Sequence, residues 1–169
     1  MERLAEGARA HNEEVDIVPV RCDGSGRLVA VGLVRTVGLD GEERWATVGG
    51  DVLPDETIEE TIARCVAETL GAAARAHLVP LPQVGMAGQP DLARSEDAAL
   101  QTGQRDSEAA YAVEIQGRLV PQPPARRFAW FLVTAMPIRE EVSTAQWALL
   151  ADFLDGWGEP RLAARMRQF

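Results

Sequence analysis

The chain has 169 residues and a net charge of −9, which is enough length for one domain with its own core. The negative charge argues against a general nucleic-acid-binding surface, and because all 17 basic residues are arginine, a lysine nucleophile is excluded. The two cysteines, Cys22 and Cys65, have the spacing of neither a metal site nor a disulfide framework, which fits a reducing, cytoplasmic location.

Residues 1–14 are acidic and predict a loose tail or a short helix, with no apolar run that indicates a signal peptide or a membrane span. Three apolar segments then predict strands, at 15–22, 27–37 and 44–48. Pro19 cannot donate a backbone hydrogen bond, so the first strand is expected at a sheet edge or at a bulge.

A glycine-containing loop followed by one amphipathic helix is predicted next. Gly49-Gly50 permits a ligand to approach the main chain closely, and residues 50–55 are expected to form the loop. Thr57-Ile58-Glu59-Glu60 matches the capping box, which places the helix at 57–70 with Thr57 as its N-cap. Gly71 is expected to end that helix.

The second half of the chain predicts further strands and two helices. Residues 84–108 show no period and are expected to form a long loop. Ser143 is expected to cap a helix that runs to Leu154, and residues 156–169 form a helical extension whose helix starts at Pro160. The remaining strands are expected at 76–81, 109–115 and 128–135.

The spacing of five residues resembles the Nudix box, G-x5-E-x7-R-E-U-x-E-E-x-G-U, in which U is a bulky apolar residue. The match covers residues 50–72 and rests on Gly50, Glu56, Arg64, Glu68 and Gly71. The Nudix family hydrolyses nucleoside diphosphates linked to another group, with a metal held by glutamates of the box helix. The resemblance implies an α/β fold, an α/β/α sandwich with a mixed sheet over residues 15–155.

This box is degenerate, because Cys65 and Thr69 stand where the family has glutamate. In the family these glutamates serve as general base and metal ligands, and of the three only Glu68 remains. Mg²⁺ prefers oxygen ligands, and neither a thiol nor a neutral hydroxyl replaces a carboxylate. The resemblance therefore implies Mg²⁺ at Glu68 and the Gly50 carbonyl, bound weakly or not at all by the free protein.

The retained box positions include those that the family uses to brace the loop. The resemblance implies that Glu56 pairs with Arg64 and that Gly71 closes the helix. Cys65 occupies a catalytic position beside Glu68 and is a candidate nucleophile or acid. Its apolar neighbours and the nearby carboxylate favour the alternative of a buried, inert thiol.

Four residues before the helix are candidates for substrate binding: Arg44, Trp45, Gly49 and Gly50. Arg44 suits phosphate because its guanidinium matches phosphate oxygens, although solvent exposure alone explains it equally well. Trp45 either stacks on a ligand base or fills the core. His77 is expected at the surface.

Two functions compete. The first is that of a divergent hydrolase. The second is that of a protein that binds a phosphorylated small molecule, with Mg²⁺-dependent hydrolysis impaired or lost. Because two of the three box glutamates are absent, we expect the binding protein. A third alternative is an enzyme of changed chemistry on the same fold. We expect no nucleic-acid or membrane partner, and a homodimer is one candidate assembly. For the hydrolase, compensating acids are available at Glu96, Asp97, Asp106, Glu108 and Glu114.

Overall fold

The computed structural model describes residues 13–81 and 108–168. The tail predicted at 1–14 and the loop predicted at 84–108 therefore fall almost wholly outside the described residues. In chain order, the elements are β1 (Glu14–Cys22), β2 (Leu28–Val37), β3 (Glu43–Ala46), β4 (Val48–Asp51), α1 (Ile58–Leu70), β5 (Arg75–Leu78), β6 (Glu108–Gln116), β7 (Arg127–Leu132), the 3-10 helix η2 (Arg139–Glu141), α2 (Thr144–Gly156) and α3 (Pro160–Arg167).

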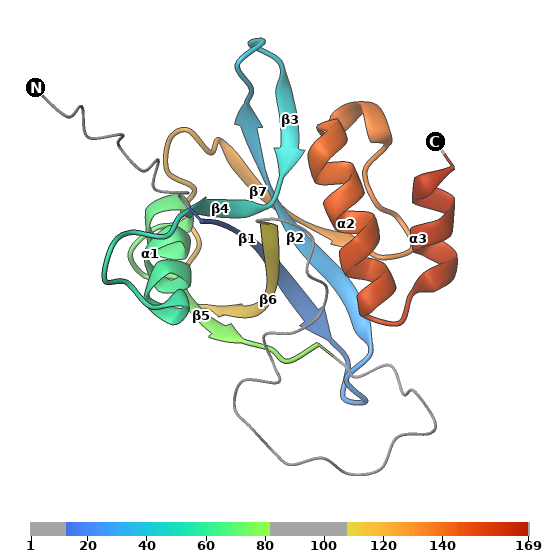
Figure 1. The fold of residues 1–169 in the computed structure, drawn as a ribbon, viewed down its shortest axis with the longest axis horizontal. Coiled ribbons are helices and arrows are strands. Elements are labelled where there is room, and N and C mark those ends of the chain that lie inside the picture. The colour runs from blue at the N-terminus through green and yellow to red at the C-terminus, as the bar shows by residue number, and fades with distance from the viewer. Residues whose placement is uncertain (1–12, 82–107, 169) are drawn as a thin grey trace, which may run out of the picture.

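The described strands form one mixed sheet, as predicted. Its order is β3-β2-β1-β6-β5, with β4 paired to β1 and β7 paired to β2. Strands β1 and β6 run parallel, and the other pairs are antiparallel. Helix α1 lies on one face of the sheet and α2 with α3 on the other (Figure 1). The architecture is therefore the predicted α/β/α sandwich. None of the helices in the described part of the chain has the length and apolar character needed to cross a membrane.

Pro19 lies in a central strand, so the prediction of a sheet edge is wrong. The first part of β1, Glu14–Ile17, pairs with β4, whereas Val20–Cys22 pairs with β2. Pro19 falls between these two ladders and is the last register position of the β1–β6 ladder, opposite Val113, so its missing N–H lies where ladders end. A register shift between Arg21 and Cys22 is the irregularity of this strand.

The strand predicted at 44–48 is two strands. The chain leaves β2 after Ala46, bends at Thr47 and pairs with β1 from Val48 onward. As a result, Gly50 and Asp51 belong to β4, and the loop predicted at 50–55 starts two residues later than expected.

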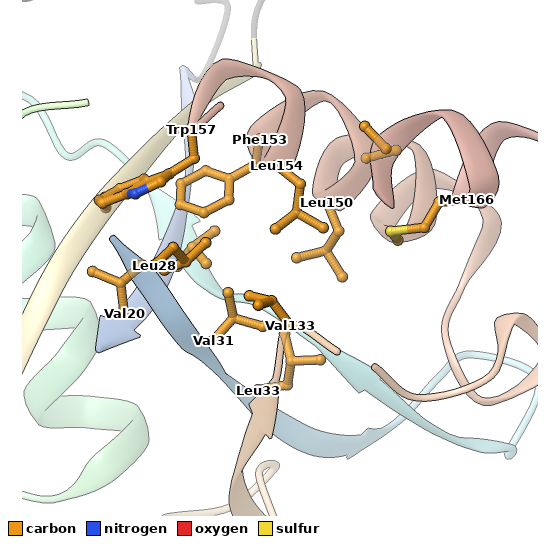
Figure 2. Close-up of a cluster of buried hydrophobic side chains, with 14 of the residues drawn as sticks. Val20, Leu28, Val31, Leu33, Val133, Leu150, Phe153, Leu154, Trp157 and Met166 are labelled. Carbon is orange, nitrogen blue, oxygen red and sulfur yellow. The ribbon is translucent and has the colours of Figure 1, made fainter. Parts of the chain in front are cut away.

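Two apolar clusters hold the sandwich together. Strand alternation sends Val15 and Ile17 to the α1 face and Val18 and Val20 to the opposite face. The box core lies under α1 and is made of Val15, Ile17, Val34, Val48, Ile62, Cys65, Val66, Leu70, Ala74, Val113 and Ala125. The C-terminal core lies under α2 and α3, where Figure 2 shows Val20, Leu28, Val31, Leu33, Val133, Leu150, Phe153, Leu154, Trp157 and Met166.

Helices α2 and α3 close the second face. Ser143 caps α2 by accepting a hydrogen bond from the Gln146 amide, as predicted, and α2 continues to Gly156, two residues beyond the expected end. Helix α3 begins at Pro160 as predicted. Trp147 Nε1 donates to the Met166 carbonyl at 2.7 Å, which ties the two helices together.

Candidate functional site

The box helix forms because its ends are satisfied locally. Thr57 Oγ1 accepts from the Glu60 amide at 3.2 Å, and Glu60 Oε2 accepts from the Thr57 amide at 2.8 Å. This is the predicted capping box. At the other end, Gly71 has a φ of +97°, a conformation that side chains disfavour, and its N–H donates to the Ala67 carbonyl. The helix predicted from Thr57 to Leu70 is confirmed.

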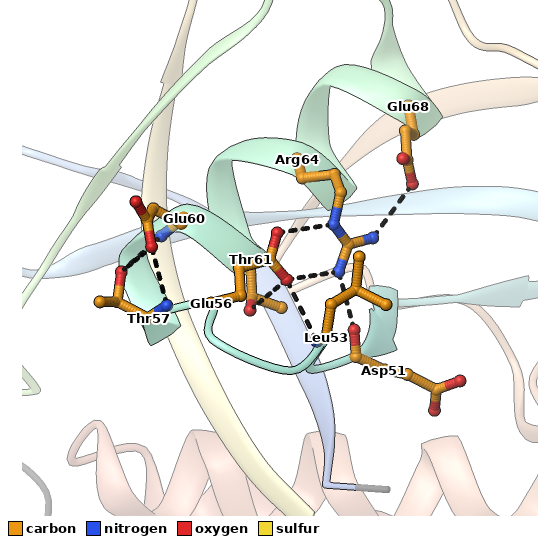
Figure 3. A network of polar contacts seen from close by, with 8 residues as sticks. All are labelled: Asp51, Leu53, Glu56, Thr57, Glu60, Thr61, Arg64 and Glu68. Atoms are coloured by element: carbon orange, nitrogen blue, oxygen red, sulfur yellow. Dashed lines mark hydrogen bonds and ion pairs between the residues drawn. The ribbon is translucent and has the colours of Figure 1, made fainter.

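Arg64 fastens the loop to this helix. Its Nε and Nη2 donate to the two oxygens of Glu56, each at 2.8 Å, and Nη2 also donates to the Asp51 carbonyl at 2.7 Å (Figure 3). Thr61 Oγ1 and the Leu53 amide donate to Glu56 as well. These hydrogen bonds, that of Arg64 first, lower the pKa of Glu56 to about 2. The predicted Glu56–Arg64 pair is confirmed, and it sets the loop conformation.

The Glu68 carboxylate lies at the outer edge of this network, directed at Arg64 and largely exposed to solvent (Figure 3). Its side chain is 64% exposed, and its contact in the described structure is an ion pair with Arg64 Nη1 at 3.3 Å. An exposed pair one turn apart on a helix stabilises by only ~0.3–0.5 kcal/mol. The ion pair therefore holds the Glu68 carboxylate only weakly, and another anion can replace it on Arg64.

Cys65, one turn before Glu68 on α1, lies inside the box core and is only 2% exposed. Burial, the largest influence, raises the pKa of its thiol. A Cβ at Gly50 would stand 2.9 Å from Cys65 Sγ, so the sulfur packs directly against the glycine backbone. This placement favours a neutral thiol that acts as a packing group.

Gly50→Ala is expected to destabilise the fold by ~1–3 kcal/mol, because the new methyl overlaps the buried sulfur. Adding Cys65→Ala should relieve the overlap, so the double variant should lose at least ~1 kcal/mol less than the sum of the single losses. Chemical denaturation measures this coupling. Gly24→Ala is the control, because a Cβ there meets nothing within 4 Å. Additive losses would contradict the packing described.

The box residues do not fit a hard divalent cation. Cys65 offers a buried sulfur, Thr69 a neutral hydroxyl, and Glu68 a single exposed carboxylate. Glu56 is committed to Arg64. Across residues 13–81 and 108–168, no group of three or more His, Cys, Asp or Glu side chains is arranged to hold a metal ion. Mg²⁺ prefers several oxygen ligands, and this donor set lacks them.

The other predicted ligand-binding residues divide between two places. Gly49 and Gly50 lie together in β4, with Gly49 exposed. Arg44 pairs with Asp40 in the β2–β3 hairpin. Trp45 is 6% exposed and packs edge-on against Phe131 in the C-terminal core, which favours the core-filling alternative.

The acids that could compensate for the missing box glutamates lie in different parts of the chain. Glu96, Asp97 and Asp106 lie outside the described residues. Glu114 is exposed and lies five residues along β6 from the position level with Gly50, or ~16 Å away. Glu108 is closer in register, because it lies opposite Glu14 of β1. His77 is exposed, as predicted.

A polar network that the sequence analysis did not predict lies beside Gly49. It joins Asp16 of β1, Thr47 at the β3–β4 bend and Gln146 of α2. The available signal was an aspartate within the apolar run of β1, where every neighbouring residue is buried.

Comparison with known proteins agrees with this fold. No curated protein matches the chain. A structure described as a possible asymmetric diadenosine tetraphosphate hydrolase from Jonesia denitrificans DSM 20603 is 24% identical, with a TM-score of 0.64 over 90% of this chain and 98% of its own. A NUDIX family hydrolase from Clostridium perfringens is 15% identical, with a TM-score of 0.53 over 85% and 96%. A UDP-X diphosphatase is 18% identical, with a TM-score of 0.51 over 86% and 63%.

These likenesses show that the chain has the Nudix fold and is related in structure to Nudix hydrolases. A family model described as a domain of unknown function, DUF4916, matches residues 9–156, and the chain belongs to that family.

Proposed function

We propose that this Nudix-fold protein binds a nucleoside-diphosphate-like or other phosphorylated small molecule at the β4 loop, with Mg²⁺-dependent diphosphate hydrolysis impaired or lost. The observation that carries the proposal is the buried, neutral Cys65 packed under Gly50, together with a box in which Glu68 is the one exposed carboxylate of the three family positions. The loop keeps its brace while the ligands for a metal are missing.

The braced loop supports binding without turnover. Arg64 fixes the loop through Nε and Nη2, while Nη1 donates to the exposed Glu68. A phosphate oxygen is a suitable replacement for that carboxylate, because guanidinium groups bind both. The related structures are described as enzymes of diadenosine tetraphosphate and of UDP compounds, and their ligand class supports a phosphorylated ligand here.

The test is calorimetric titration with pyrophosphate, ADP, UDP, ADP-ribose and diadenosine tetraphosphate, in EDTA and again in Mg²⁺, with phosphate release followed in parallel. We expect at least one compound to bind in EDTA and turnover to stay far below ~1 s⁻¹. Absence of binding to every compound counts against the proposal. Turnover at ordinary enzymatic rates supports the hydrolase instead.

One observation favours that second candidate, an active hydrolase with compensating acids. Glu108 of β6 lies opposite Glu14 of β1, and Glu14 lies opposite Asp51 of β4. Acidic residues thus occupy three positions in one row across the sheet, next to Gly50. If the wild type hydrolyses diphosphates, Glu108→Gln should abolish the activity and Glu114→Gln should not.

The homodimer and the cytoplasmic location stay predictions from the sequence.

A further inference from the structure

Asp16 is a buried carboxylate whose hydrogen-bond partners are neutral side chains. It is 8% exposed in the central strand β1, where Val18 and Val20 on the same face belong to the C-terminal core. No arginine or histidine of the described residues lies within ion-pair distance of it. Burying a carboxylate without a counter-charge is costly, so this position needs a physical reason.

The carboxylate is held by neutral groups through one of its oxygens. Asp16 Oδ1 accepts from Gln146 Nε2 at 3.1 Å and is in short contact with Thr47 Oγ1. Gln146 Oε1 in turn accepts from the Thr47 amide at 2.9 Å and contacts Thr47 Oγ1 at 2.8 Å. Three elements therefore fix the direction of this side chain.

The second oxygen, Oδ2, has no hydrogen-bond partner in the described part of the chain. In that same part, no fully buried side-chain oxygen or nitrogen lacks a partner, so Oδ2 keeps some exposure to solvent. Gly49 lies directly opposite Asp16 in β4 and is exposed. A Cβ at Gly49 would stand 2.7 Å from the Val15 carbonyl oxygen and 3.6 Å from Asp16 Oδ1, so only glycine allows β4 to lie this close to β1 beside the carboxylate.

The two glycines of β4 are successive residues, so they lie on opposite faces of the sheet. Gly50 faces Cys65 and the α1 side, whereas Gly49 faces Asp16 and the α2 side. Among the described strands, β4 pairs only with β1, which leaves its other edge unpaired. This edge therefore borders both faces of the sheet, the one where Gly50 lies against Cys65 and the one where Gly49 lies opposite Asp16.

We propose that Asp16, oriented by Thr47 and Gln146, is the acceptor that recognises the organic part of the ligand. It would take a hydrogen bond from an amino or hydroxyl group of a nucleobase or sugar attached to the phosphate. This inference rests on the proposed function. It adds a specificity residue on the α2 side of the sheet, away from the box.

The experiment compares wild type, Asp16→Asn and the exposed control Glu42→Gln by calorimetry in EDTA, with pyrophosphate, ADP, GDP, CDP and UDP as probes. Wild type should bind at least one nucleoside diphosphate more tightly than pyrophosphate. Asp16→Asn should weaken that compound by roughly 10–100-fold, because amide N–H groups replace the acceptor oxygen. Pyrophosphate affinity should stay within about twofold, since a phosphate at the box does not touch Asp16.

A merely structural role for Asp16 would change all affinities together, so the ratio between nucleoside diphosphate and pyrophosphate is decisive. Gln146→Met, at a half-buried position in the first turn of α2, is the second variant and should lower the same ratio to a smaller extent. An unchanged ratio in Asp16→Asn overturns this inference alone. Loss of binding only when Mg²⁺ is present assigns the carboxylate to a cation and also overturns it. If no compound binds wild type, the proposed function falls too.

Discussion

Arg64→Met is expected to lower the melting temperature by ~5–10 °C and to loosen the loop between Asp51 and Glu56. The guanidinium donates two hydrogen bonds to the Glu56 carboxylate and one to the Asp51 carbonyl, and no other side chain of the described residues joins Glu56 to Asp51. Without it, the Glu56 side chain, only 15% exposed, keeps its contacts with Thr61 and the Leu53 amide. A partly buried carboxylate that has lost its cation destabilises the folded state.

The same variant should change the dependence of stability on pH. In the folded protein the pKa of Glu56 is lowered from its ordinary value of 4.5 to about 2, first by the hydrogen bond from Arg64. A lowered carboxyl pKa stabilises the fold above pH 4.5, and this contribution is lost as pH falls from about 4.5 to about 2. In Arg64→Met the loss across this window should be smaller, because the main cause of the shift is gone.

Thermal unfolding followed by circular dichroism between pH 2 and 7 measures both effects. Arg118→Met is the matched control, because Arg118 is exposed and makes no ion pair within the described residues. If the two variants melt alike and show the same pH profile, the Glu56–Arg64 bracket does not stabilise the loop.

The box helix could be predicted because its determinants are local. The cap, the brace and the terminating glycine lie within 22 residues, from Gly50 to Gly71, and each follows from the chemistry of one short contact. The sheet was predicted strand by strand, but not the split at Thr47. That bend depends on Gln146 and Asp16, which are 99 and 31 residues away from Thr47.

The site residues could likewise be placed from the sequence only where their surroundings are set by nearby residues. The sequence predicts apolar surroundings for Cys65, because its neighbours on the same helix face are apolar. In the structure Cys65 is buried. Trp45 and Asp16 were harder, since both lie in strands whose two faces look alike in sequence. Which face meets α2 depends on where that helix packs, and for Asp16 its contact residue Gln146 is 130 residues away, so no local pattern carries that information.

Cys65→Glu combined with Thr69→Glu is expected to produce Mg²⁺ binding and to raise diphosphate hydrolysis by orders of magnitude over wild type. The two positions lie one helical turn apart, with Glu68 beside them. Glutamates there would add two hard oxygen ligands to a site that now has one exposed carboxylate. Since position 65 is buried, the new carboxylates should cost ~1–3 kcal/mol of stability in EDTA.

Binding of a metal to the folded state alone should restore this loss, so Mg²⁺ should raise the melting temperature of the double variant but not that of wild type. Cys65→Gln with Thr69→Gln is the matched control, because it has the same size without the charge and should show neither effect. Phosphate release from ADP-ribose and diadenosine tetraphosphate gives the second measurement. Wild-type turnover of ~1 s⁻¹ or more would place the catalytic acids elsewhere. Loss of such turnover in Cys65→Ser would show that the thiol takes part in the chemistry, against its placement in the box core.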